Sequence, residues 1–142
     1  MLIKMEAIIL VGIAGCGKTA FCKKFLPHHT RISLDDIHKH NRSVEDRLIN
    51  QNLSSGNNIV IDDTNLTRSI RSRHIENIKN FDARINAVFF NYSIHRIQLQ
   101  NIRRDNPIPS HVLFHMRKQL EMPIYDEGFD YIQTLNDDFR IY

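Results

Sequence analysis

The chain has 142 residues, of which 42% are hydrophobic and 25% are charged, and this composition fits a single globular domain over residues 1–142. The net charge of +3 is too small to indicate a partner by itself. The longest apolar run, Ala7 to Ala14, is too short to span a membrane, so we expect no membrane association. Cys16 and Cys22 predict reduced thiols of a cytoplasmic protein rather than a disulfide framework.

The first apolar run, Ala7 to Gly12, predicts a buried strand, and the pattern of a phosphate-binding loop follows it. The segment GIAGCGKT has the spacing Gly, four residues, Gly-Lys-Thr, and it leads into a helix predicted from Lys18 to Leu26. Glycines let backbone N–H groups turn toward phosphate oxygens, and the helix adds its positive N-terminal dipole. We expect ATP or another nucleoside triphosphate to bind here, with contacts from Gly12, Gly15, Cys16, Gly17, Lys18 and Thr19.

Two side chains of this loop have chemical roles of their own. Lys18 can reach the β and γ phosphates, and the hydroxyl of Thr19 can bind Mg²⁺. A glycine-rich turn with an incidental lysine is the alternative interpretation, but the position between a strand and a helix favours the phosphate loop.

A short second strand is predicted from Thr30 to Ser33, and the adjacent acids Asp35 and Asp36 follow it. A carboxylate that faces the γ phosphate can accept the proton of an attacking hydroxyl. The alternative is a turn or helix-capping aspartate. Farther on, Ser43-Val44-Glu45-Asp46 has the form of a capping box and predicts a helix that ends at about Ser55.

A third strand, Asn58 to Asp62, also ends in acids. Asp62 and Asp63 are suited to hold or orient Mg²⁺, although a capping role is the alternative for either. Asn65 orders the turn or caps the next helix, which is predicted from Thr67 to Phe81. Periodicity places one set of that helix's residues toward the core and another toward solvent. The inner set is Ile70, His74, Ile78 and Phe81, and the outer set is Arg68, Arg71, Ser72 and Lys79.

The last third of the chain contains two helices between two strands. The strands are predicted from Arg84 to Asn91 and from Phe129 to Leu135. The helices are capped by Ser93 and Ser110 and end at about Arg104 and Pro123. Between them lies a loop with two prolines, Asp105 to Pro109.

The two helices and their loop, about residues 96–121, have the form of a mobile lid. Arg103 and Arg104 precede the loop, where they either neutralise a transferring phosphoryl group or complement the helix dipole. His111 and His115 have helical spacing, but the absence of a glutamate between them favours a surface or packing role over zinc.

Strands and helices alternate along the chain, which predicts an α/β fold of the P-loop NTPase type. We expect a parallel sheet of four to five strands flanked by helices, with the helical lid above it. Ligands of such sheets bind outside the carboxyl ends of the strands. The phosphate loop, the pair Asp35 and Asp36, and the pair Asp62 and Asp63 should therefore surround one crevice.

Four segments together resemble the polynucleotide 5′-hydroxyl kinases. They are GIAGCGKT at Gly12 to Thr19, SLDDIH at Ser33 to His38, VIDDTNLT at Val60 to Thr67, and RRDNPIPSHVLFHMRKQLEMPIYDEGF at Arg103 to Phe129. The resemblance implies that ATP, with Mg²⁺ on Thr19, phosphorylates the 5′-OH end of RNA or DNA, and that Asp35 is the general base. It further implies a lid arginine at Arg104, assisted by Arg103, and substrate contacts by Asp63 and Asn65.

Two positions depart from that family. His38 stands where the family usually has an arginine that grips a phosphate of the acceptor strand, and Gln100 replaces another lid arginine. We expect His38 to contact the acceptor and hypothesise that Arg42, one helical turn on, substitutes for the missing arginine. The phosphatase motif of larger family members, Asp-x-Asp-Gly-Thr, does not occur in the sequence, so kinase activity alone is expected.

The sequence leaves two other functions open. One is a small-molecule phosphotransferase on the same fold, acting on a nucleoside, a sugar, an antibiotic or, like the zeta toxins, a nucleotide sugar. The other is a nucleotide-binding switch without phosphotransfer, which would not need a base beside the γ phosphate.

Overall fold

A computed structural model describes residues 4–141 and confirms the predicted α/β fold with a parallel sheet. The five strands lie in the order β2-β3-β1-β4-β5, and all neighbours are parallel. The strands are β1 (Met5–Val11), β2 (Thr30–Ile32), β3 (Ile59–Ile61), β4 (Ala83–Phe90) and β5 (Tyr131–Leu135). The helices are α1 (Lys18–Phe25), α2 (Arg42–Ser54), α3 (Arg68–Ile78), α4 (Ile94–Asn101) and α5 (Ser110–Gln119). Three single 3₁₀ turns are η1 (Leu34–Asp36), η2 (His38–His40) and η3 (Tyr125–Glu127).

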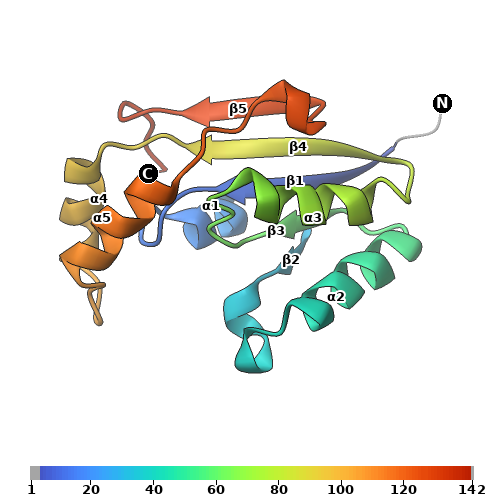
Figure 1. Cartoon of the computed structure of the whole chain (residues 1–142), viewed down its shortest axis with the longest axis horizontal. Coiled ribbons are helices and arrows are strands. Elements are labelled where there is room, and N and C mark those ends of the chain that lie inside the picture. The colour runs from blue at the N-terminus through green and yellow to red at the C-terminus, as the bar shows by residue number, and fades with distance from the viewer. Residues whose placement is uncertain (1–3, 142) are drawn as a thin grey trace.

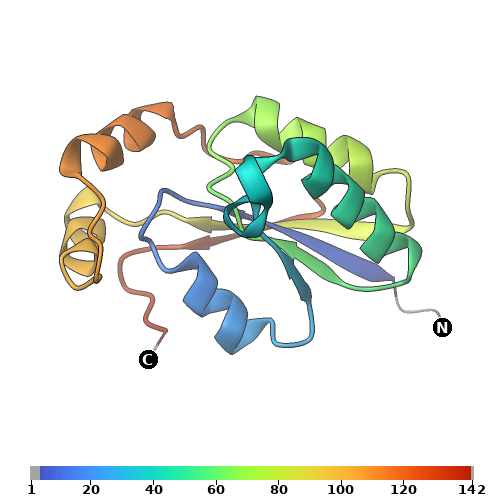
Figure 2. The same ribbon diagram turned by 90° about the horizontal axis from the view of Figure 1, so that it is seen from below.

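The helices cover both faces of the sheet, and strand alternation decides which residues meet which helix. One face of β1, with Ala7 and Ile9, packs with Ile49 of α2 and Ile75 of α3. The other face contacts α1, where Phe21 and Cys22 are buried. Figure 2 shows α2 and α3 on one side of the sheet and α1 on the other. Successive residues of a strand therefore belong to different layers.

The predicted lid helices, α4 and α5, lie together beyond the carboxyl ends of β1 and β4 (Figure 1). Ile97 of α4 and Leu113 of α5 are buried in the same cluster as Phe21 of α1. The lid is thus anchored to the layer that contains the phosphate loop. None of the helices within residues 4–141 is long and apolar enough to cross a membrane.

Several helix ends differ from the prediction for local reasons. Asn41, rather than Ser43, caps α2, because its side-chain oxygen accepts hydrogen bonds from the N–H groups of Ser43 and Val44. Helix α4 ends at Asn101 and does not reach Arg104, because the Asn101 side chain bonds the backbone of Ile108 on the returning chain. Ser110 is the first residue of α5, and Pro109 precedes it as the cap.

The expectation that Arg71 faces solvent was wrong. Its side chain is fully buried and forms a bidentate ion pair with Glu127, with Nε–Oε1 at 2.8 Å and Nη2–Oε2 at 3.0 Å. Nη1 also donates to the carbonyl oxygens of Asn65 and Leu66. Arg71 precedes His74, Ile75 and Ile78 by three, four and seven residues, so the helical period places it on the buried face of α3, and the outer assignment was a misreading of that period. Its partner lies 56 residues away, where the pattern of the helix cannot reveal it.

Candidate active site

The phosphate loop is held in shape by two glycines and by close packing. Gly15 and Gly17 have φ of +82° and +96°, a region that favours glycine. Gly12 donates its N–H to the carbonyl of Thr64 at 3.0 Å. A Cβ at Gly12 would lie 2.7 Å from Cys16 Sγ, so a side chain there would displace the loop. Cys16 and Cys22 are both buried free thiols, and burial raises both thiol pKa values above their usual range.

Lys18 lies beneath the loop and ties its backbone together. Its Nζ donates to the carbonyl oxygens of Gly12 and Ile13 at 2.9 and 3.0 Å. The ammonium is therefore fixed at the floor of the loop, next to the N-terminus of α1. This is the position from which it can contact the terminal phosphates of a nucleotide.

Thr19 and Asp62 meet at the start of α1. The Thr19 hydroxyl donates to Asp62 Oδ2 at 2.8 Å, and the Asp62 side chain is nearly buried. A hydroxyl and a carboxylate are the hard oxygen donors that Mg²⁺ prefers. The residues therefore fit the ion that the sequence predicted at Thr19, with Asp62 as its companion rather than Asp63.

Asp63 points to the opposite layer, as strand alternation requires. Its Oδ1 accepts the N–H of Leu34 at 2.7 Å, and its Oδ2 lies 3.3 Å from Arg42 Nη1. Arg42 also bonds Glu45 Oε1 at 2.7 Å. Asp63 thus ties the end of β3 both to the turn that contains Asp35 and to the start of α2.

Burial changes the pKa values of Asp63 and His74, which lie together beside Glu45. Burial, followed by the neighbouring Glu45 carboxylate, raises the pKa of Asp63 to about 7. Burial lowers the pKa of His74 to about 4, so its imidazole is neutral at physiological pH. His74 Nε2 lies 3.1 Å from Asn65 Oδ1, and it lies 3.9 and 3.8 Å from oxygens of Glu45 and Asp63. Although these three ionisable side chains are spaced like metal ligands, the Arg42 guanidinium already supplies their cation.

Asn65 is buried, and its side chain forms hydrogen bonds within the protein. Its backbone has φ of +47°, and its side chain is 1% exposed. Nδ2 donates to the carbonyl of Leu10 at 2.7 Å, which leaves Oδ1 to accept the proton on His74 Nε2. The described contacts of Asn65 order the loop after β3, and its predicted contact with substrate stays a prediction.

The residues expected to bind the acceptor are dispersed. Asp35, in η1, has a side chain that is 89% exposed and lines the pocket. His38 begins the separate turn η2 and is exposed. Lys39 and His40 have positive φ, so no helical turn connects His38 with Arg42. The hypothesis that Arg42 replaces an arginine at His38 is weakened further by its two bonds to Glu45 and Asp63.

The lid reaches the phosphate loop through Arg104. Asn101 Nδ2 donates to the carbonyl of Ile108 at 2.7 Å, and Ile108 N donates back to Asn101 Oδ1 at 2.9 Å. This pair closes the turn that contains Arg103 and Arg104. A Cβ on Gly15 would lie 3.5 Å from Arg104 Nη1, so the guanidinium stands directly over the loop. Arg103 is exposed on the same turn.

One pocket of about 460 Å³ collects the phosphate loop, both acidic strand ends and the lid. The structure thereby brings together members of all three predicted sets, the phosphate loop, Asp35, and the pair Asp62 and Asp63, whereas Asp36 does not line this pocket. The lining residues are Ala14, Gly15, Gly17, Lys18, Thr19, Ala20, Arg31, Ser33, Asp35, Asp62, Asp63, Thr64, Arg104 and Ile108. The size and the cationic loop suit the phosphates of a nucleotide.

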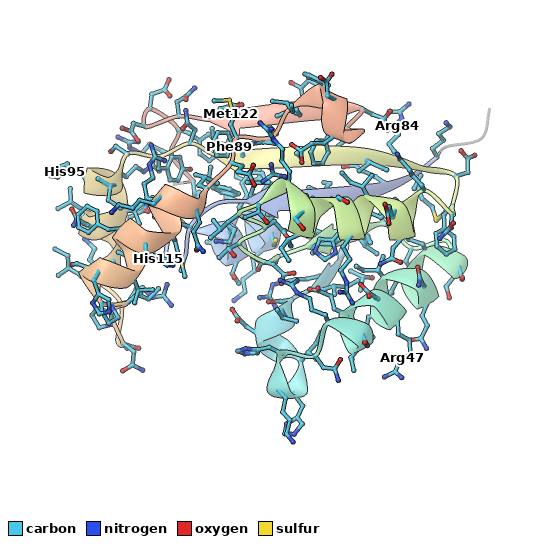
Figure 3. The ribbon with its side chains drawn as sticks, in the orientation of Figure 1. Arg47, Arg84, Phe89, His95, His115 and Met122 are labelled. Atoms are coloured by element: carbon cyan, nitrogen blue, oxygen red, sulfur yellow. The ribbon has the colours of Figure 1, made fainter. Side chains whose placement is uncertain are left out.

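Sequence reasoning missed three residues of this region, namely Arg31, Glu45 and His74 as a partner of the acids. Arg31 lies inside the predicted second strand but was given no role there, and Glu45 was interpreted only as part of a capping box. The two-residue period of β2 and β3 was the available signal. It would have placed Arg31 and Asp62 on the α1 side, and Asp63 on the side of α2 and α3. The lid histidines His111 and His115 are exposed, as expected (Figure 3 labels His115).

Comparison with known proteins gives a family model and a set of similar folds. The model described as an AAA domain matches residues 8–123. A gluconokinase from Sinorhizobium meliloti 1021 is 18% identical with a TM-score of 0.70, covering 95% of this chain and 84% of that one. A fungal RNA kinase is 21% identical with a TM-score of 0.65, covering 94% and 75%. Kti12 of Chaetomium thermophilum, solved with ADP-AlF3, is 15% identical with a TM-score of 0.64, covering 93% and 89%. At these identities the likeness to solved structures is one of fold.

Proposed function

This chain belongs to the AAA domain family that residues 8–123 match, and on that premise we propose that it is an ATP-dependent phosphotransferase acting on the 5′-hydroxyl end of RNA or DNA. The proposal rests on the set of side chains that line one pocket. Lys18 and Thr19 of the phosphate loop face the same space as the Asp35 carboxylate and the lid cation Arg104. Phosphoryl transfer requires this combination of charge neutralisation and a proton acceptor.

The residues divide the reaction between them. Lys18 and the loop N–H groups bind the donor phosphates, and Arg104 covers them from the lid. Mg²⁺, held by Thr19 and Asp62, would neutralise charge on the donor phosphates. Asp35 accepts the proton of the acceptor hydroxyl, and the oxygen of that hydroxyl forms the new bond to the γ phosphorus. The bond from that phosphorus to the bridging oxygen breaks, and ADP leaves.

A nucleic-acid acceptor is supported by the surface of the lid. Arg103 and Arg104 are exposed on the turn, and Arg117 and Lys118 are exposed on α5. Phe114 of α5 is 45% exposed. Cations with an exposed aromatic ring suit a phosphate backbone and an unpaired base. The fold similarity to the fungal RNA kinase is consistent with this acceptor.

A small-molecule acceptor is the second candidate, and one observation favours it. Arg42 is held between Glu45 and Asp63, and His38 is exposed on a separate turn, so the acceptor side offers little for gripping a strand phosphate. A hydroxyl on a sugar or a nucleoside needs less cationic surface. The similarity to the gluconokinase fold accords with this alternative.

An acceptor screen with labelled ATP tests both candidates. The panel contains single-stranded RNA, single-stranded DNA, nicked duplex, nucleosides and gluconate, each with a free hydroxyl. Asp35→Asn should lower the phosphorylation rate about a hundredfold, because it removes the proton acceptor. Asp82→Asn is the matched control, since Asp82 is an exposed carboxylate paired with Lys4 away from the pocket.

Transfer to the oligonucleotides alone supports the nucleic-acid proposal, and transfer to a nucleoside or gluconate alone replaces it with the small-molecule reaction. Transfer at the wild-type rate in Asp35→Asn would reject Asp35 as the base. ATP binding without transfer to any acceptor would leave the non-catalytic switch as the remaining function.

A further inference from the structure

Arg31 is a cationic side chain of the pocket that the mechanism above does not use. It comes from the middle of β2, on the face of the sheet that contacts α1, and its side chain is 31% exposed. It lines the pocket together with Lys18 and Arg104. A strand residue of this kind is fixed in position more firmly than a loop residue.

The guanidinium of Arg31 contacts three elements at once. Nε donates to Asp62 Oδ2 at 2.7 Å, and Nη1 donates to Asp36 Oδ2 at 2.6 Å. Nη2 lies 3.5 Å from Thr19 Oγ1. The fork therefore joins the end of β3, the turn η1 and the first turn of α1.

Arg31 shares its acceptor with the predicted metal site. Asp62 Oδ2 receives both the Thr19 hydroxyl and Arg31 Nε. A divalent cation bound by Thr19 and Asp62 would lie against the same oxygen, where an arginine would repel it and occupy the carboxylate's lone pairs. One carboxylate cannot neutralise both cations fully.

We propose that Arg31 competes with the divalent cation for Asp62 and Thr19, and so sets the affinity of the nucleotide site for metal. The inference rests on the proposed function, because it takes Thr19 and Asp62 as the metal-binding pair. Arg31 is a positioning residue in this scheme. When metal binds, the Nε bond to Asp62 is given up, and Asp36 keeps the guanidinium beside the pocket.

Direct metal binding tests the competition without an activity assay. Binding of Mn²⁺ is measured by electron paramagnetic resonance on wild type, Arg31→Gln and Arg84→Gln, each with and without ADP. Arg84 is a matched control, because it is an exposed arginine near the start of β4, at the end of the sheet away from the lid (Figure 3). We expect Arg31→Gln to bind Mn²⁺ about tenfold more tightly than wild type, and Arg84→Gln to match wild type.

A thermal measurement gives a second readout. Removing Arg31 leaves Asp62 with its hydroxyl partner alone, so Mn²⁺ should raise the Tm of Arg31→Gln by more than it raises that of wild type. If Arg31→Gln fails to fold, Arg31→Lys takes its place, because lysine keeps the charge without the three-way fork. The expected result for that variant is tighter Mn²⁺ binding than wild type, by a smaller factor.

Equal or weaker Mn²⁺ affinity in the Arg31 variant, with or without ADP, would overturn the competition. Failure of the proposed function looks different. It appears in the acceptor screen as no transfer to any oligonucleotide, while the comparison of Mn²⁺ affinities between the proteins without nucleotide still decides the role of Arg31.

Discussion

The buried ion pair between Arg71 and Glu127 provides a stability prediction with a defined size. Glu127→Gln keeps the shape of the side chain but removes its charge, so the Arg71 guanidinium stays in the core with two carbonyls and one amide oxygen as acceptors. Breaking a buried pair by neutralising one partner costs about 3–5 kcal/mol. For a chain of this size, that cost lowers Tm by about 10–15 °C.

The same helix offers a matched control. Arg73 forms an ion pair with Asp46 at 2.7 Å, but its side chain is 45% exposed. Because water screens such a pair, Arg73→Gln should cost less than about 1 kcal/mol. Both variants and the wild type are compared by urea unfolding followed by circular dichroism, and by thermal melting.

The comparison has a clear point of failure. If Glu127→Gln loses no more stability than Arg73→Gln, the buried Arg71–Glu127 pair contributes no more to the free energy of unfolding than the exposed pair, and the reasoning is refuted. A loss of the expected size with unchanged nucleotide affinity shows that the pair supports the fold. A loss of nucleotide affinity as well would follow from the bonds of Arg71 to Asn65 and Leu66, which hold the loop beside Thr64.

Three further predictions concern the pocket and its surroundings. Because the pKa of His74 is lowered in the folded state, the free energy of unfolding falls as pH drops from about 6.5 toward 4. Because the pKa of Asp63 is raised, the free energy of unfolding falls as pH rises from about 4 toward 7, so the two residues have opposite effects on the pH dependence of stability. His74→Gln should therefore gain about 2 kcal/mol relative to wild type between pH 6.5 and 5 in urea unfolding, and parallel pH profiles would contradict this. Asn101→Ala frees the turn of Arg104 and should raise the Kd for ADP about tenfold in calorimetry; an unchanged Kd would show that the turn holds without it. Arg42→Ala should destabilise the fold by about 3 kcal/mol in urea unfolding, because buried carboxylates lose their cation; a rise of about tenfold in acceptor KM without loss of stability would instead restore its hypothesised role as a substrate contact.

The sequence predicted the order of the elements and the place of the pocket, because both depend on local signals. The phosphate loop pattern and the alternation of strands and helices put Lys18, Asp35 and Asp62 at one edge of a parallel sheet. Strand and helix limits moved by only a few residues where the hydrophobic period was clear. Helices α3, α4 and α5 all end a few residues before their predicted limits, and in α4 the bonds between Asn101 and Ile108 turn the chain there.

Long-range pairing was beyond the reach of the sequence. The burial of Arg71 depends on Glu127 and the role of Arg31 on Asp62, and both partners lie far along the chain. Periodicity assigns a residue to a face of its own element but does not say what covers that face. Charged side chains on covered faces are therefore the residues for which prediction from one sequence failed.

The alternation at the end of β3 has a consequence for how substitutions in this chain act on the pocket. Asp62 and Asp63 are chain neighbours, yet the first belongs to Thr19 and Arg31 and the second to Arg42, Leu34 and the helices α2 and α3. A substitution on α2 or α3 can thus reach the Asp35 turn through Asp63 while the Thr19–Asp62 pair stays in place. One peptide unit thus separates the side of the pocket that is bonded to the phosphate loop helix from the side that is bonded to α2.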